Sequence, residues 1–84
     1  MLSVKVLGPG CANCVKVEAV ARKAIATLGI EATLEKVTDY QKIMEYPILA
    51  TPGLVVNEQL VVDGRIPAES EVIGHIRKAL AVAA

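Results

Sequence analysis

Residues 2–14 read LSVKVLGPGCANC. The segment Leu2–Leu7 is apolar and rich in β-branched residues, and it stops at the helix- and strand-breaking cluster Gly8–Gly10, so we predict a β-strand followed by a turn. From Cys11 to Leu28 apolar side chains recur at spacings of three and four residues, and Gly29 follows. This pattern predicts a long amphipathic helix that ends at the glycine.

The next segment of the chain alternates between apolar and polar residues. This period of two over Glu31–Val37 predicts a strand at an edge of the sheet, with one side near water. Thr38 and Gln41 have the spacing of a capping box, which predicts a short second helix that Pro47 prevents from continuing. The side chains expected on one face of this helix are Tyr40, Ile43 and Met44.

Two further apolar runs and a final helical pattern complete the chain. Leu54–Val56 and Leu60–Asp63 flank the turn-prone Asn57-Glu58-Gln59, which predicts an antiparallel hairpin. Residues 68–84 show helical periodicity, which predicts a third helix. Gly74 lowers the stability of this helix by about 1 kcal/mol relative to alanine. The apolar positions of this third helix are Val72, Ile73, Ile76, Leu80 and Ala83.

The predicted order of elements is βαβαββα. A strand, helix and strand joined by a right-handed crossover form a parallel pair, and the hairpin adds an antiparallel pair. We therefore predict an α/β fold with a mixed four-stranded sheet flanked by three helices, in one domain over residues 1–84.

Composition excludes several classes of function. The chain has 84 residues, of which 54% are hydrophobic, and nine basic residues balance nine acidic ones. It therefore lacks the positive field that attracts nucleic acid or anionic membranes, and with Tyr40 and Tyr46 as its only aromatic residues it has little with which to stack on bases. No apolar run approaches the ~18 residues of a membrane span, and Met1–Leu7 lacks the features of a signal peptide, so we expect a cytoplasmic protein.

Cys11 and Cys14 are too close in sequence to join distant parts of a fold, and their spacing indicates redox chemistry. Cys11 falls at the predicted helix N-terminus, where backbone N–H groups and the helix dipole stabilise a thiolate, so we predict that it is the nucleophile. Cys14 lies one turn deeper on the same side and within bridging distance, which predicts a resolving thiol. Such a pair supports thiol–disulfide exchange without a metal or organic cofactor.

A second motif precedes the predicted hairpin. In Ala50-Thr51-Pro52-Gly53 the proline removes a ladder donor, and the bond between Thr51 and Pro52 is a candidate for the cis form. The alternative interpretation is a simple turn that leads into the strand.

These features together resemble a known fold. The element order, the CxxC after the first strand and the Thr-Pro before the third are similar to the thioredoxin fold in its smallest, glutaredoxin-like form. More closely, segments Gly8–Cys14, Thr51–Val56 and Asp63–Pro67 resemble the small "redox-active disulfide protein 2" family of bacteria and archaea. The resemblance implies a thiol–disulfide oxidoreductase that acts on disulfide-bearing proteins and is reduced by a flavoenzyme of the thioredoxin-reductase type. We expect a monomer.

The resemblance also implies roles for individual residues. Pro52 would be cis and pack against the disulfide, and the backbone of Thr51 would pair with an extended substrate peptide. The candidate substrate-binding residues are Thr51, Pro52, Gly10, Ala12 and Asn13.

The chain departs from thioredoxins and glutaredoxins at several positions. Gly10 replaces the tryptophan that precedes the first cysteine of thioredoxins, and Ala12-Asn13 replaces their Gly-Pro. Neither Glu18 nor the acidic residues of the second strand occupy an obvious core position, so no proton-relay carboxylate is assigned. Gly8–Gly10 carries no charge and Asp63-Gly64-Arg65 matches the glutathione-binding motif of glutaredoxins poorly, which argues against glutathione as reductant.

The main alternative is a soft-metal module that binds copper or zinc through the same CxxC. Two thiolates suit Cu(I), and the motif resembles that of copper-chaperone domains of βαββαβ order. Those domains end in a strand, whereas residues 68–84 are predicted to be helical, and Pro9 stands at the position of their usual methionine. A structural zinc site needs four ligands, and Cys11, Cys14 and His75 supply three. Two buried structural cysteines are the remaining interpretation.

Overall fold

A computed structural model of the protein describes residues 2–10 and 12–83. Its elements follow the predicted βαβαββα order. They are β1 (Leu2–Leu7), α1 (Ala12–Leu28), β2 (Ala32–Val37), α2 (Tyr40–Ile43), β3 (Gly53–Val56), β4 (Gln59–Asp63) and α3 (Glu69–Ala83). The predicted nucleophile, Cys11, lies outside the described residues. Within the described part of the chain, no helix has the length and apolar character needed to cross a membrane.

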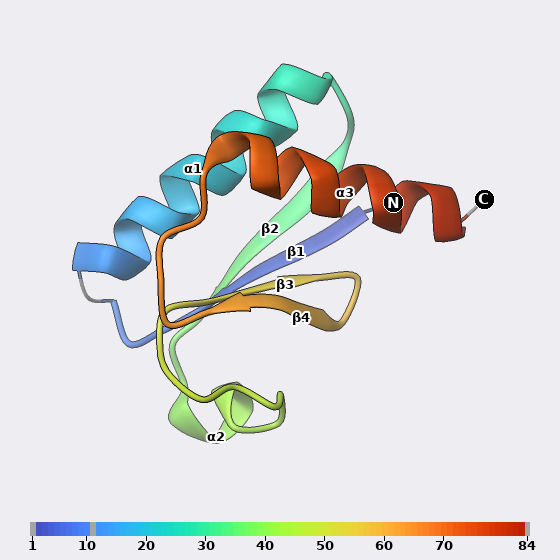
Figure 1. The fold of residues 1–84 in the computed structure, drawn as a ribbon. Helices are drawn as coiled ribbons and strands as arrows, with labels where there is room; N and C mark the ends of the chain where they lie inside the picture. The colour runs from blue at the N-terminus through green and yellow to red at the C-terminus, as the bar shows by residue number, and fades with distance from the viewer. Residues whose placement is uncertain (1, 11, 84) are drawn as a thin grey trace.

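The four strands form one mixed sheet in the order β2-β1-β3-β4 (Figure 1). β1 pairs in parallel with β2, and α1 makes the crossover between them. β3 pairs antiparallel with both β1 and β4. The structure confirms the predicted fold class and the position of β2 at an edge of the sheet.

Helices cover the two faces of the sheet unequally. α1 and α3 lie on one face, whereas α2 lies on the other (Figure 1). Because side chains alternate along a strand, Val6 of β1 joins the larger core under α1 and α3, and its neighbour Leu7 joins a smaller cluster beside α2. This smaller cluster consists of Leu7, Val37, Ile43 and Val55, with Tyr46, Ile48 and Leu60 packed around it.

The apolar stripe predicted for the first helix faces the sheet. Its buried residues are Cys14, Val17, Ala21 and Ala24. Ile25 and Leu28 are half-buried and pack against the same core. The helix ends at Gly29, whose φ of 65° lies in the left-handed region that glycine adopts without steric cost.

The second helix differs from the prediction in its cap and in its buried face. Asp39, rather than Thr38, is the N-cap, and its Oδ1 accepts a hydrogen bond of 2.9 Å from the backbone N–H of Gln41. Ile43 is buried, whereas Tyr40 and Met44 are exposed. The reason is length: α2 has only four residues, so a single turn directs one side chain toward the sheet.

The hairpin is tighter than predicted. Its turn is Asn57-Glu58, and both residues have positive φ, at 49° and 68°, as a two-residue type I′ turn requires. β4 consequently begins one residue earlier than expected, and β3 also begins one residue earlier, at Gly53. A bulge leaves Val61 without a partner in the ladder between β3 and β4. In α3, Val72 and Ile76 are buried as predicted, whereas Leu80 is exposed.

Candidate functional site

Three segments of the predicted site meet at one end of the sheet. The antiparallel register pairs Leu7, the last residue of β1, with Gly53, the first residue of β3. The turn Gly8–Gly10 therefore leaves the sheet beside Thr51-Pro52, which leads into β3. α1 starts at the far end of the same turn, so the fold itself brings the CxxC region to the proline loop.

Cys14 lies in the interior at this end of the molecule. Its side chain is 5% exposed, on the face of α1 that packs against the sheet. The backbone of Gly8 lies directly against it, since a Cβ atom placed on Gly8 would be 2.2 Å from Cys14 Sγ. Gly8 is held in turn by a hydrogen bond of 2.9 Å from its N–H to the carbonyl of Val37. The predicted burial of Cys14 is thus confirmed, while the place of Cys11 stays a prediction.

The other candidates around the CxxC are at the surface. Gly10, Ala12 and Asn13 are all exposed. Gly10 has a φ of 92°, a conformation that a residue with a Cβ rarely adopts, so this turn depends on a glycine there. These residues are accessible to a partner, as a substrate-binding role would require.

The proline loop is held by the segment that ends β4. The peptide bond between Thr51 and Pro52 is cis, with Thr51 exposed and Pro52 buried. The backbone N–H of Gly64 donates to the carbonyl of Pro52 at 2.9 Å. The carboxylate of Asp63 accepts from the N–H of Leu49 at 2.8 Å. Sequence analysis noted Asp63-Gly64 only as part of a family-like motif and missed these contacts.

A cavity of about 390 Å³ joins the two loops. Its lining includes Pro9 from the turn after β1 and Thr51 from the proline loop. Leu49, at its rim, is 94% exposed, and Tyr40 and Met44 are also exposed apolar side chains of the lining. Sequence patterning did not identify this apolar rim, because the burial of a residue in a loop follows from packing and not from periodicity.

The loop that carries Pro52 has a further attachment near its start. Tyr46 accepts a hydrogen bond of 3.2 Å from the Lys5 ammonium and donates one of 3.1 Å to Glu58. Lys5 and Glu58 also form an ion pair of 2.7 Å. Hydrogen bonds from Lys5 to Glu58 and Tyr46 raise the pKa of Lys5 and lower that of Glu58. This cluster links β1, the loop after α2 and the hairpin turn.

Glu18 lies one helical turn after Cys14, but it is engaged elsewhere. Its carboxylate pairs with Arg22 at 2.8 Å and with Lys36 at 3.6 Å. The hydrogen bond from Arg22, with the charge of Lys36, lowers the pKa of Glu18. Because this carboxylate is engaged with Arg22 and Lys36, it is not assigned as the proton relay that sequence analysis left open.

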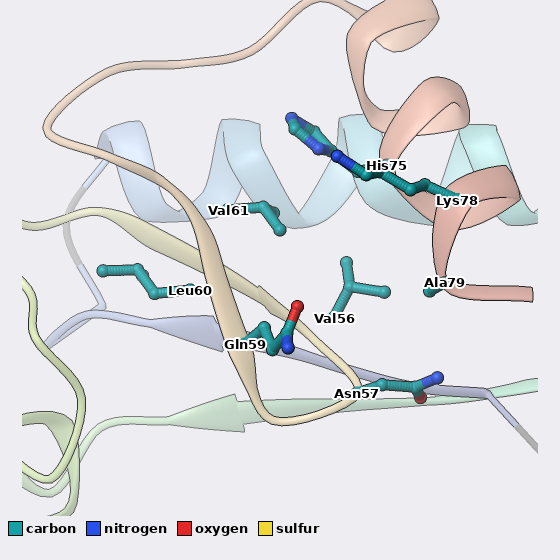
Figure 2. Close-up of a pocket in the computed structure, with 8 residues that line it drawn as sticks. All are labelled: Val56, Asn57, Gln59, Leu60, Val61, His75, Lys78 and Ala79. Atoms are coloured by element: carbon teal, nitrogen blue, oxygen red, sulfur yellow. The ribbon is translucent and has the colours of Figure 1, made fainter. Parts of the chain in front are cut away.

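A second cavity, of about 460 Å³, lies at the opposite end of the sheet (Figure 2). Asn57 marks its position, because the N–H of Asn57 bonds to the carbonyl of Ser3 near the start of β1. His75 of α3 lines this cavity. His75 therefore lies at the other end of the sheet from Cys14 and from the turn after β1, and the structure does not bring it to the cysteine motif as a third metal ligand. Although this cavity is the larger, we assign the site to the cysteine end, where the thiol and the proline loop converge.

Comparison with known proteins agrees with this geometry. Residues 2–77 match the family described as Thioredoxin domain. The thioredoxin of Methanothermobacter thermautotrophicus is 39% identical over 72 residues, which cover 86% of this chain and 94% of that protein. The thioredoxin of Methanocaldococcus jannaschii is 32% identical over 80 residues, which cover 95% of this chain and 92% of that protein. The chain therefore belongs to the thioredoxin domain family.

Proposed function

We propose that this protein is a thiol–disulfide oxidoreductase that reduces disulfides in protein substrates through Cys11 and Cys14. The observation that carries the proposal is the burial of Cys14 against Gly8, at the end of the sheet where Pro52 also lies. Membership of the thioredoxin domain family supports the same chemistry. We also propose that the chain belongs, within this family, to the small "redox-active disulfide protein 2" group.

In the proposed reaction the Cys11 thiolate attacks one sulfur of a substrate disulfide. The substrate S–S bond breaks, its second sulfur leaves as a thiolate that takes up a proton, and a mixed disulfide forms. Cys14 then loses its proton and attacks the Cys11 sulfur, which releases the substrate as a dithiol and closes the bond between the two cysteines. The substrate gains two electrons and the protein loses two, which a flavoenzyme of the thioredoxin-reductase type would return.

The two sulfurs have different surroundings in this scheme. The N-terminus of α1 would stabilise the Cys11 thiolate through its backbone N–H groups and helix dipole. Cys14 is buried, so its sulfur is less accessible to an incoming substrate disulfide than a thiol at the surface would be, which suits a second, resolving thiol. An asymmetry of this kind sets the order of attack.

Substrate binding is proposed at the proline loop and the cavity beside it. Thr51 is exposed, so its backbone is open to pair with an extended peptide. Gly10, Ala12 and Asn13 would border the peptide on the cysteine side. The apolar rim at Leu49, Met44 and Tyr40 would bind an apolar side chain next to the substrate disulfide.

Trapping variants test the proposal. Incubated with a protein disulfide substrate such as insulin, Cys14→Ser should accumulate a mixed disulfide through Cys11, because the resolving step is removed. Cys11→Ser is the matched control and should accumulate none. Capture by Cys11→Ser alone would reverse the assigned roles, and capture by neither variant would contradict the exchange mechanism.

A redox titration of the wild-type protein provides the second measurement. In dithiothreitol buffers, alkylation and mass measurement should detect a reversible disulfide between the cysteines, with a potential of about −200 to −300 mV. Thiols that fail to pair, and that only stoichiometric Zn²⁺ or Cu(I) protects from alkylation, would identify the metal-binding alternative instead.

A further inference from the structure

We propose that Asp63 is a positioning residue that holds the substrate-pairing loop, residues 49–52, in its binding conformation. The inference rests on the proposed function and deepens it, because it assigns a role in substrate binding to a residue outside the cysteine motif.

Two hydrogen bonds from the end of β4 bracket the loop. Asp63 Oδ2 accepts from the N–H of Leu49 at 2.8 Å, and the N–H of Gly64 donates to the carbonyl of Pro52 at 2.9 Å. Between these two anchors lie only Ala50 and Thr51. The residue whose backbone would pair with substrate is therefore fixed from both sides.

Packing of side chains provides little restraint for residues 49–51 of this loop, although Pro52 is buried. Leu49 is 94% exposed, and Ala50 and Thr51 are exposed as well. No side chain of residues 49–51 is buried, so between Ile48, which packs against the small cluster, and the buried Pro52 the hydrogen bond from Leu49 to Asp63 is the restraint that the described residues show. A bond to a carboxylate is stronger than one between neutral groups, which suits an exposed position.

Gly64 lies beside the loop at the end of β4, in a backbone conformation that favours glycine. Its φ of 73° lies in the left-handed region, and a Cβ atom there would be 3.4 Å from the Cβ of Ala50. The loop thus packs over a residue without a side chain, directly after the residue that supplies the carboxylate. Asp63 and Gly64 act as a pair, one through its side chain and the other through its backbone.

The anchor is itself connected to the sheet and to α3. Asp63 is paired with Gly53 in the sheet. Beyond Gly64, the Arg65 guanidinium bonds both carboxylate oxygens of Glu71 in α3, with an Nη1 to Oε1 distance of 2.8 Å. Pro67 is buried near the end of the connection to α3. The segment that holds the loop is therefore tied to both the sheet and the helix.

This arrangement predicts a specific kinetic signature. Without the Asp63 carboxylate, residues 49–51 would have to be ordered during binding, which weakens the binding of a peptide. A small disulfide that makes no backbone pairing would be unaffected, as would the potential of the cysteine pair. A purely structural or electrostatic role would change the rate for both kinds of disulfide.

The experiment compares Asp63→Ala and Asp63→Asn with wild type. Reduced protein is mixed with a disulfide-containing peptide or with hydroxyethyl disulfide. For Asp63→Ala we expect the half-saturating peptide concentration to rise about tenfold, the usual scale for losing one hydrogen bond to a charged group, with the saturating rate within about twofold. Asp63→Asn keeps an acceptor oxygen and should recover most of the loss. Hydrogen exchange of the Leu49 amide should accelerate in Asp63→Ala.

Glu35→Ala is the matched control, since it removes an exposed carboxylate for which the described residues show no hydrogen bond or ion pair. If Asp63→Ala does not fold, Asp63→Val replaces it, because valine also lacks an acceptor and favours a strand. Equal slowing with both disulfides, or no change with the peptide, would overturn the positioning role. A wild-type protein that reduces neither disulfide would instead contradict the proposed function.

Discussion

Gly8 is the residue whose identity bears most directly on Cys14. Sequence analysis interprets it as the start of a turn, yet the structure shows a different reason for a glycine. A Cβ atom at this position would meet Cys14 Sγ at 2.2 Å and Cys14 Cβ at 3.2 Å. Both residues are buried, so a side chain on Gly8 could not avoid the sulfur by turning toward solvent. Gly8 is needed because the backbone directly after β1 approaches a sulfur, which no local sequence pattern reveals.

Replacing Gly8 by alanine tests this approach. We expect Gly8→Ala to lower the free energy of unfolding by about 1–3 kcal/mol, the usual cost of overpacking, because Cys14 or the strand has to move. Disulfide exchange should slow as well, since the displaced group is the proposed resolving thiol. Urea unfolding and the insulin assay measure the two effects.

The same substitution at Gly74 is the control. In α3 a Cβ atom on Gly74 would meet nothing within 4 Å. Gly74→Ala should therefore raise the free energy of unfolding by about 1 kcal/mol, because alanine has the higher helix propensity. Equal effects of the two substitutions would contradict the close approach of Gly8 to Cys14.

At the scale of the elements, the connection between β4 and α3 joins parts of the site that are distant in sequence. On one side Asp63 and Gly64 bond to the proline loop, and on the other Arg65 bonds to Glu71 in α3. The hydrogen bond from Arg65 lowers the pKa of Glu71, and the nearby His75 acts in the same direction. The ionised form of Glu71 is therefore favoured by folding.

This pKa predicts how the contact depends on pH. Because the pKa of Glu71 in the folded state lies below its ordinary value of 4.5, its contribution to stability is present above pH 4.5 and is lost as pH falls through the folded-state value. Glu71→Gln should thus destabilise the protein at pH 7 and have a smaller effect at pH 3. Urea unfolding at both values measures this, with Glu35→Gln as control. A destabilisation that is equal at both values would show that the ion pair is not responsible.

Across the whole molecule, the sheet separates a large core from a small one. Ile76 belongs to the large core under α1 and α3, while Ile43 anchors α2 to the other face. The small cluster includes Ile48, which also lines the cavity beside Thr51. Most of the buried apolar side chains therefore lie on the face covered by α1 and α3. The loops of the proposed substrate site lie around the smaller cluster on the face of α2.

Two truncations separate these contributions. Ile76→Ala removes a fully buried side chain and should lower the free energy of unfolding by about 2–5 kcal/mol. Leu49→Ala, at a position that is 94% exposed, should change it by no more than about 0.5 kcal/mol. Leu49→Ala should nevertheless weaken the binding of a peptide disulfide, if the apolar rim binds substrate. A large loss of stability in Leu49→Ala would place that side chain in the core instead.

The sequence by itself determined the order of the elements, the sheet type and the burial of Cys14, because each follows from local periodicity or from a short motif. It also indicated that the peptide bond between Thr51 and Pro52 is a candidate for the cis form. Its errors were local: it placed the cap of α2 at Thr38 instead of Asp39, and it grouped the exposed Tyr40 and Met44 with the buried Ile43. A helix of one turn is too short for its periodicity to identify the buried face.

Only the tertiary structure decided which segments meet. The contact of Gly8 with Cys14, the hydrogen bond between Asp63 and Leu49, and the cavity between Pro9 and Thr51 depend on strand register and on the packing of α2. Periodicity reports how one element presents its side chains to a core. It contains no information on which residue of a distant loop will face them, because that is settled when the strands pair and the loops close over the end of the sheet.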